Sequence, residues 1–213
     1  MLVLGINTVS DVCEVALARG PVLRLERSET MSKGHDARLA PLVEELMRAA
    51  GVAMDELNRI AVIVGPGSFT GVRVGVAFAR GLALAVDTPA VGVTSLEALA
   101  FGAQGRVLAA MPAKRRPPEL SWWAQVIEAG RGVGEPVEAD AVALRAMTAD
   151  ASAIWGCGLE LAALGQGFNE ARPTSSAAAL FAAGLCDGDL PGPRPIYVRE
   201  PDAAPQLKPL APR

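Results

Sequence analysis

A glycine-rich turn between two apolar segments constrains the fold of this chain more than any other feature. Residues 60–64, Ile-Ala-Val-Ile-Val, predict a buried strand, and residues 70–86 predict a long helix. The turn between them has the sequence Gly-Pro-Gly-Ser-Phe-Thr-Gly over residues 65–71. A strand, a tight turn and a helix in this order can present backbone N–H groups and a helix N-terminus to an anion.

The turn allows this chemistry without requiring it. It lacks the Gly-Lys-Ser/Thr of a P-loop, and its glycines do not have the spacing of a dinucleotide-binding fingerprint. Gly65 and Gly67 supply unusual backbone angles, Pro66 fixes one angle, and Thr70 can cap the helix. The residues alone favour a tight structural turn over an anion site and leave both open.

Hydrophobic periodicity predicts an α/β layout for the first hundred residues. A stripe of leucines predicts a helix over residues 35–50, with Asp36 as its N-cap and Gly51 at its end. A strand is expected at 90–93, and a short helix follows it. Three early strands are expected at residues 1–6, 12–18 and 22–27. The resulting order, βββαβαβα, is that of the actin-like ATPase superfamily.

The second half of the chain has weaker signals. A loop is expected at residues 112–118, which contain the basic cluster Lys114-Arg115-Arg116. Residues 200–213 hold four prolines and no apolar period, which predicts a loose tail. Apolar runs predict strands at 106–110, 122–127 and 153–155, and a helix at 175–183 that ends at Gly184.

The string at residues 65–75 resembles the signature of the TsaB family, whose older name is YeaZ. Members of that family carry Gly-Pro-Gly-Ser-Phe-Thr-Gly after a strand, then a hydrophobic residue, an arginine, a hydrophobic residue and a glycine. The closing segment Pro195-Ile196-Tyr197-Val198-Arg199 is also similar to the family's last strand. The resemblance identifies as motif residues Gly65, Pro66, Gly67, Ser68, Phe69, Thr70, Gly71, Arg73 and Gly75.

This resemblance implies an actin-like ATPase (ASKHA, ribonuclease H-like) fold. Such a fold is α/β and has two lobes, each with a mixed β-sheet and helices. We therefore expect an N-terminal lobe at 1–100 that carries the motif and a smaller, degenerate second lobe at 101–190. A C-terminal strand and loose tail are expected at 191–213.

Two positions that are acidic in actin-like ATPases carry other residues here. The resemblance places Asn7 and Pro112 where the fold's two phosphate loops hold the nucleotide's metal ion and attacking water. Neither side chain offers a charge to Mg²⁺. TsaD, the catalytic relative of this family, binds metal through a His-x-x-x-His pair, which the single histidine of this chain, His35, cannot supply. Ser68 has no nearby base in the sequence to activate it as a nucleophile. We expect no catalytic residue, no metal site and no cofactor held by this chain alone, with ATP and metal belonging to the partner subunits.

Composition narrows the class of protein further. A net charge of −3 argues against a chain that holds nucleic acid by itself, so tRNA is expected to bind only through a complex. The cysteines at 13, 157 and 186 are far apart in apolar surroundings, which favours buried, reduced thiols in a cytoplasmic protein. No apolar run is long enough to span a membrane.

The helix at 70–86 is apolar around most of its circumference. Its two charges lie on a narrow arc made by Arg73, Ala77, Arg80 and Leu84, and the apolar remainder spans roughly two to three times the roughly 100° that one sheet covers. Either the helix is enclosed within its own domain, or one side meets the sheet and another meets a partner chain. The predicted partner-binding residues are Leu39, Leu42, Val43, Leu46, Gly75 and Ala79.

The resemblance implies that this surface packs against TsaD in a four-helix bundle, and that it forms a homodimer when TsaD is absent. The function it implies is that of a non-catalytic subunit that pairs with TsaD, with TsaE in the larger complex, for threonylcarbamoylation of adenosine 37 in tRNAs that read ANN codons. Two alternatives stay open: a small-molecule kinase or ATPase of the same fold, and a homodimeric interaction module with no tRNA role.

Overall fold

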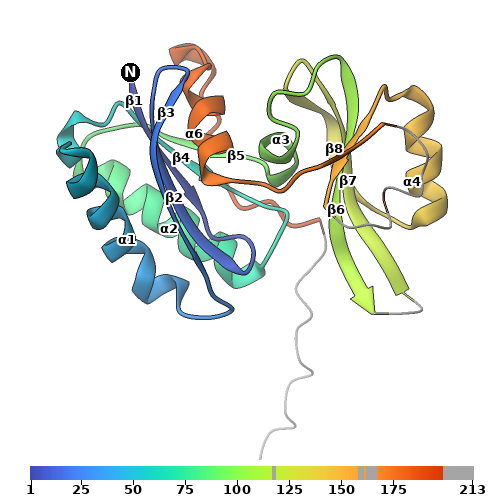
Figure 1. Cartoon of the computed structure of the whole chain (residues 1–213), viewed down its shortest axis with the longest axis horizontal. Coiled ribbons are helices and arrows are strands. Elements are labelled where there is room, and N and C mark those ends of the chain that lie inside the picture. The colour runs from blue at the N-terminus through green and yellow to red at the C-terminus, as the bar shows by residue number, and fades with distance from the viewer. Residues whose placement is uncertain (117–118, 158–160, 162–166, 199–213) are drawn as a thin grey trace, which may run out of the picture.

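Two five-stranded sheets form two lobes that lie side by side (Figure 1). The computed structural model of the chain describes residues 1–116, 119–157, 161 and 167–198. Each sheet contains both parallel and antiparallel strand pairs. The predicted α/β fold with two mixed sheets is therefore confirmed.

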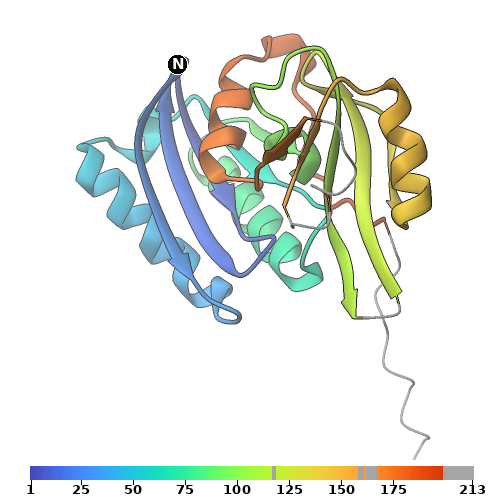
Figure 2. The same cartoon turned by 45° about the vertical axis from the view of Figure 1, so that its right-hand side comes forward.

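The first sheet has the strand order β3-β2-β1-β4-β5 and is covered on both faces. Helices α1 (His35–Ala50) and α2 (Phe69–Ala85) pack on one face, and α6 (Ser175–Ala183) packs on the other (Figures 1 and 2). This double cover buries every residue of β1 and β4, as expected of central strands. The strands are β1 (Leu2–Asn7), β2 (Val12–Arg19), β3 (Val22–Thr30), β4 (Arg59–Ile63) and β5 (Ala90–Val93).

The predicted element order of the first lobe is confirmed, and the helix caps differ from prediction. Helix α1 begins after Gly34, whose φ of 88° is in the left-handed region, and Asp36 lies in the first turn without capping it. Helix α2 is capped by Ser68, whose Oγ accepts a hydrogen bond from the Gly71 N–H at 3.2 Å, so Thr70 is not the cap. The 3₁₀ turn η1 (Met54–Glu56) precedes β4, and α3 (Ser95–Leu99) follows β5.

The second sheet has the order β10-β9-β6-β7-β8, with a helix on each face. Helix α3 packs on the face that looks toward the first lobe, and α4 (Ala141–Met147) covers the outer face (Figure 1). The 3₁₀ turn η2 (Thr148–Asp150) follows α4. The strands are β6 (Arg106–Arg116), β7 (Glu119–Glu128), β8 (Arg131–Ala139), β9 (Ile154–Gly156) and β10 (Phe168–Glu170).

The loop predicted at 112–118 is wrong for residues 112–116. Strand β6 continues through them and pairs with β7, and a register shift between Pro112 and Lys114 accommodates the proline, which cannot donate to the ladder. Strand β8 and helix α4 were not predicted at all. Two glycines and Pro136 hide the apolar alternation of β8, which as an edge strand tolerates them.

Helix α6 packs on the first sheet, although it lies within the residues 101–190 that were expected to form the second lobe. Both ends of α6 are held by charged side chains of the first sheet. At its start the buried Glu14 accepts a hydrogen bond from the Ser175 N–H at 3.2 Å. At its end the buried Arg59 donates to the carbonyls of Ala182 and Leu185 and pairs with Asp187. A carboxylate at the start and a guanidinium at the end both complement the helix dipole.

The closing segment is extended and does not form the predicted strand. Between η3 (Asp187–Asp189) and residue 198 it makes two backbone hydrogen bonds to the first sheet, from Gly92 N to Pro191 O and from Ile196 N to Val64 O, each 2.8 Å. Prolines at 193 and 195 remove the donors that a ladder would need. Arg199 and the tail predicted at 200–213 lie outside the described residues.

An ion-pair cluster ties α1 to the edge strand β3. The Arg38 guanidinium binds Glu29 on β3 and Glu45 on its own helix. These contacts with Arg38 lower the pKa of both carboxyl groups below the usual 4.5. Among the described helices, none is both long and apolar enough to cross a membrane.

Candidate functional site

The glycine-rich turn packs against neighbouring segments, and several of its backbone N–H and carbonyl groups are hydrogen-bonded within the protein. The Ser68 N–H donates to Val9 O at 2.7 Å, and the Gly71 N–H donates to the Ser68 hydroxyl. Ser95 donates through its N–H to Gly65 O and through its hydroxyl to Pro66 O, both at 2.7 Å. These contacts favour the structural interpretation of the turn over an anion site.

Each motif glycine lies where another segment comes close. A Cβ on Gly67 would lie 2.6 Å from Val9 O, and a Cβ on Gly71 would overlap Thr8 O. A Cβ on Gly65, whose φ is 105°, would lie 2.6 Å from the carbonyl oxygen of Ile196 in the closing segment. The glycines therefore seat the β1–β2 loop and the closing segment against α2.

The motif arginine joins the two parts of the predicted signature. The Arg73 guanidinium lies 3.7 Å from the centroid of the Phe69 ring, and its Nε donates to the Tyr197 hydroxyl at 3.1 Å. The two rings are 5.0 Å apart, and Tyr197 is 42% exposed. This contact explains why a Phe-Thr-Gly-x-Arg string and a distant Pro-x-Tyr string occur together: they form one surface cluster.

Asn7, the first degenerate phosphate-loop position, is fully buried in a hydrogen-bond network. Its Nδ2 donates to Glu14 and to Pro173 O, each at 3.0 Å, and its Oδ1 accepts from the Val9 N–H at 3.1 Å. Arg172 pairs with Glu14 at 2.7 Å from its exposed side. Every polar atom of the Asn7 amide is thus engaged in holding β1, the β1–β2 loop and the segment before α6 together.

Pro112, the second such position, lines a cavity of about 330 Å³ between the lobes. Met111 and Trp123 form the same wall, and the β1–β2 loop, Gly67 and Arg172 lie around it. Asn7 does not line this cavity, but Val9 and Pro173, to which its side chain is hydrogen-bonded, do. Among the described residues no group of three His, Cys, Asp or Glu side chains could hold a metal ion.

The single histidine and two of the three cysteines are at least partly buried. His35 is buried, and its Nε2 lacks a hydrogen-bond partner among the described residues. Cys13 is fully buried, and burial raises the pKa of its thiol to about 11. Cys157 is half-buried beside the cavity, and Cys186 is exposed, so the prediction of three buried thiols is wrong for Cys186.

The predicted partner-binding residues face the core of their own lobe. All four on α1 are at most 1% exposed, and Ala79 on α2 is fully buried. Gly75 faces the Thr8 hydroxyl and Val62. The chain covers α2 on two sides, with its sheet and with α1, so these positions are packed inside the lobe. The four α1 residues are Leu39, Leu42, Val43 and Leu46.

The surface that α2 presents to solvent is the narrow arc recognised in the sequence. Arg73, Ala77, Arg80 and Leu84 are all exposed. Leu84 is 86% exposed, the largest value among the exposed large hydrophobic side chains of the described residues. Leu84 is thus the exposed apolar side chain of this arc, and Arg73 and Arg80 are its exposed charges.

Comparison with known sequences gives one consistent family. A profile described as "TsaD: tRNA N6-adenosine threonylcarbamoyltransferase" matches residues 28–117. The chain is 35% identical over 147 residues to the tRNA threonylcarbamoyladenosine biosynthesis protein TsaB of Escherichia coli K12, covering 67% of this chain and 62% of that protein. It is 40% identical over 106 residues to TsaB of Bacillus subtilis, covering 50% and 45%. The chain thus aligns with roughly half of the length of these relatives.

Other matches extend over the whole chain. An uncharacterized protein of Mycobacterium tuberculosis H37Rv is 32% identical over 206 residues, covering 95% of this chain and 94% of that one. The solved structure of YeaZ from Pseudomonas aeruginosa has a TM-score of 0.69 at 26% identity and covers 92% of this chain and 99% of its own. A ROK hexokinase from Thermus thermophilus, with a TM-score of 0.53 at 14% identity over 86% of this chain and 97% of its own, shares the fold alone.

Proposed function

The chain belongs to the TsaB (YeaZ) family, and on this premise we propose that it is a non-catalytic subunit that pairs with TsaD in tRNA threonylcarbamoyladenosine synthesis. The observation that carries the proposal is the complete motif at residues 65–75, together with the Arg73–Tyr197 contact that joins it to the closing segment. In this proposal TsaD transfers the threonylcarbamoyl group to adenosine 37 of tRNAs that read ANN codons, and TsaE joins the larger complex. The protein acts in the cytoplasm.

The absence of catalysis is supported by the surroundings of Asn7, the first of the two phosphate-loop positions. The Asn7 amide uses its donors on Glu14 and Pro173 O, and Glu14 is itself paired with Arg172. Neither the Asn7 amide nor the Glu14 carboxylate is left to coordinate a nucleotide's metal ion. ATP and metal therefore belong to the partner subunits, and this chain binds no cofactor by itself.

The pairing surface in this proposal is the exposed arc of α2 around Leu84. Burying that leucine and the ring-stacked Arg73 would give a contact with an apolar centre and charged margins, the usual anatomy of an interface. The same arc would form a homodimer when TsaD is absent. A net charge of −3 supports a chain that binds tRNA weakly or not at all by itself and firmly only within the complex.

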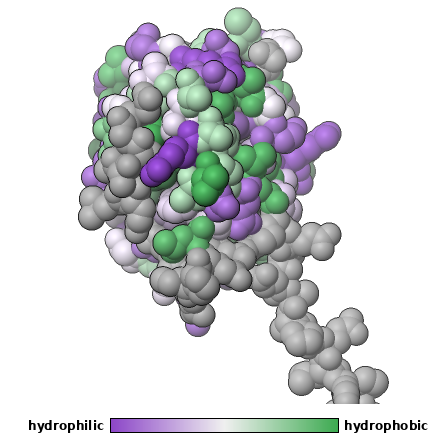
Figure 3. Space-filling view, turned by 90° about the vertical axis from the view of Figure 1, so that its right-hand side faces the viewer, coloured by the Kyte–Doolittle hydropathy of each residue, from purple (hydrophilic) through white to green (hydrophobic). Residues whose placement is uncertain are grey.

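The test is co-purification of TsaD with the wild-type chain and with Leu84→Glu. A lone charge buried at an interface costs several kcal/mol, so pairing should weaken by more than 100-fold. The control is Val142→Glu on α4, because Val142 is 79% exposed on the opposite lobe. Figure 3 views that outer face, where hydrophobic and hydrophilic residues are interspersed. Pairing with TsaD that survives Leu84→Glu, or is lost equally in Val142→Glu, would contradict the proposed surface.

Two further measurements separate this function from its alternatives. Depleting the chain in cells should remove threonylcarbamoyladenosine from total tRNA, whereas a homodimeric module without a tRNA role would leave it unchanged. Purified chain should release no phosphate from ATP and Mg²⁺. A turnover above about 0.1 s⁻¹, near the bottom of ordinary enzyme rates, would instead support a kinase or ATPase.

A further inference from the structure

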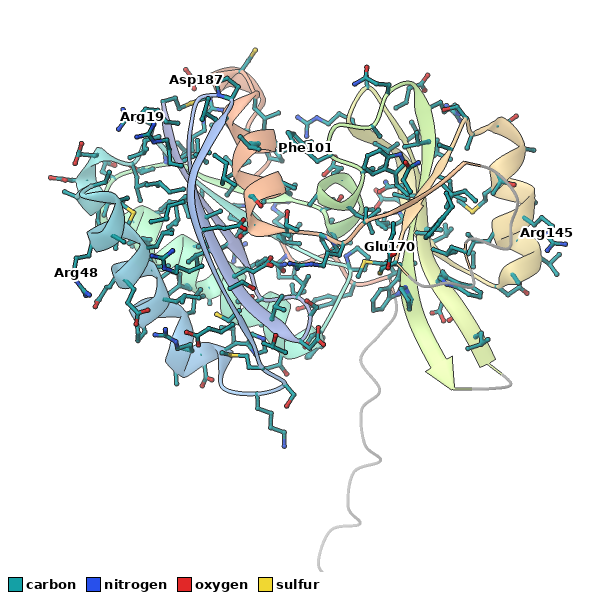
Figure 4. The ribbon with its side chains drawn as sticks, viewed as in Figure 1. Arg19, Arg48, Phe101, Arg145, Glu170 and Asp187 are labelled. Atoms are coloured by element: carbon teal, nitrogen blue, oxygen red, sulfur yellow. The ribbon has the colours of Figure 1, made fainter. Side chains whose placement is uncertain are left out.

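A small surface pocket with two arginines lies at the outer end of the first lobe, away from the second lobe. Its volume is about 230 Å³. Arg19 at the end of β2 and Arg24 on β3 contribute its charges, Leu17 and Leu25 lie below them, and the last turn of α1 closes one side. Figure 4 labels Arg19 on this outer side, together with Arg48 of α1. We refer to this feature as the arginine pocket.

A β-bulge brings Arg24 into the pocket. In the β2–β3 ladder Leu17 pairs with Leu25 and Ala18 pairs with Leu23, so Arg24 is the extra residue without a partner. A bulge re-aims side chains that regular alternation would place on opposite faces. Here it sets Arg24 on the α1 side of the sheet, where Arg19 also lies.

The two arginines have no counter-charge among the described residues. Neither makes an ion pair, whereas Arg38, Arg59, Arg106 and Arg172 each bind a carboxylate. No carboxylate lines the pocket. Near its edge, the Gly51 and Val52 N–H groups bind the carbonyls of Arg48 and Met47 in the last turn of α1. The pocket thus concentrates positive charge in a chain that is acidic overall.

We propose that the arginine pocket binds a phosphate group, and that this phosphate belongs to an RNA backbone. Guanidinium groups match phosphate oxygens with paired hydrogen bonds, which makes arginine the usual residue for this contact. At about 30 Å³ per water, the pocket has room for a phosphate group and some of its hydration. The RNA source rests on the proposed function, because a subunit of a tRNA-modifying complex meets that polyanion.

The location of the pocket agrees with this source. Helices α1 and α2 each run back from the end of one strand to the start of a later strand. Because β1, β4 and β5 are parallel, both helices finish at the end of the first sheet where these strands begin. The arginine pocket and Leu84 therefore lie at one end of the lobe. RNA held by a partner at Leu84 could reach the pocket without crossing the molecule.

The first experiment measures tRNA affinity of the assembled complex with TsaD at several salt concentrations. In the double variant Arg19→Gln/Arg24→Gln we expect the slope of log K against log salt to become shallower by about 0.7–0.9, since both arginines bind one phosphate and a single phosphate contact is lost. The control variant Arg145→Gln/Arg194→Gln removes the same charge from two exposed arginines elsewhere. Equal slopes in the two variants would overturn the proposal. Loss of TsaD binding in the pocket variant alone would also overturn it, by making the pocket a protein contact.

The second experiment uses the free chain, so it does not depend on TsaD. Nuclear magnetic resonance follows the arginine Nε–Hε signals while tRNA or inorganic phosphate is added. We expect tRNA to shift the signals of Arg19 and Arg24 more than that of Arg145, with a dissociation constant in the non-specific range of about 10⁻⁴–10⁻⁶ M. Shifts with inorganic phosphate only would overturn the RNA source, and no selective shift with either probe would overturn the pocket itself. A wild-type chain that fails to bind TsaD would instead contradict the proposed function.

Discussion

Replacing Gly71 by alanine should destabilise the first lobe, because this glycine seats the β1–β2 loop against α2. The added Cβ would overlap the Thr8 carbonyl oxygen, which is backbone and cannot rotate away. Relief requires the helix or the loop to move, and the buried hydrogen bond from the Thr8 hydroxyl to Gly71 O, now 2.7 Å, would lengthen. Overpacking costs about 1–3 kcal/mol and a lost hydrogen bond about 1 kcal/mol, while alanine regains about 1 kcal/mol of helix propensity. The expected net loss is about 1–3 kcal/mol.

Gly81 provides the matched control on the same helix. A Cβ there would meet nothing within 4 Å, and the position is exposed. Gly81→Ala should therefore raise the free energy of unfolding by about 0.8–1 kcal/mol through helix propensity alone. The two substitutions are chemically identical, so the predicted opposite signs isolate the close approach of the loop.

Urea unfolding followed by far-ultraviolet circular dichroism measures both variants. Tryptophan fluorescence is unsuitable, because all three tryptophans (122, 123 and 155) lie in the second lobe. If Gly71→Ala is as stable as the wild type while Gly81→Ala gains stability, the loop moves freely. The glycine would then not be needed for packing, and the reasoning would be refuted.

Three further predictions follow from buried and paired groups. Arg59→Met should lower the free energy of unfolding by about 2–3 kcal/mol, because it removes charged hydrogen bonds at the end of α6. Asp187→Asn changes a carboxylate that is 96% exposed and should cost less than about 1 kcal/mol, and urea titration compares the two variants. Iodoacetamide at pH 8 should label Cys186 rapidly and Cys13 only after unfolding, since burial raises the Cys13 pKa to about 11; mass spectrometry of peptides gives both rates. Arg38→Gln should lower the free energy of unfolding at pH 7, and the difference from wild type should shrink as the pH falls below 4.5. The reason is that Glu29 and Glu45, whose pKa values are lowered by Arg38, stabilise the fold only while they are ionised. A difference of unchanged size at pH 3 would contradict this.

The sequence predicted the first lobe well because its signals are local. The leucine stripe of α1 and the apolar runs of β1 and β4 have periods that only one secondary structure satisfies. Strand β8 has no such period, since glycines and a proline interrupt it and its partner β7 provides the pairing. Strand β8 therefore depends on tertiary contacts, which cannot be predicted from the sequence of this segment alone.

The candidate site was predicted in part. The sequence shows that Asn7 and Pro112 lack a carboxylate, and it could not show that Glu14 and Arg172 surround Asn7, because these residues come together only when α6 returns to the first sheet. The glycines at 71 and 75 allow another segment to approach α2 closely, and the approaching segment is the chain's own loop at Thr8. A stripe of small residues shows that a segment comes near and does not show which segment it is.

The late position of α6 in the sequence determines when the first sheet can be completed during translation. When the ribosome has released the first lobe's five strands, one face of the sheet still lacks its helix, because α6 is encoded after the whole second lobe. At 5–20 residues per second, roughly 80 further residues take about 4–16 seconds to appear. Throughout that interval the apolar side chains that α6 will cover are open to water and to other chains. A chain that stops before α6 would leave this apolar face of the sheet uncovered, which favours aggregation over independent folding.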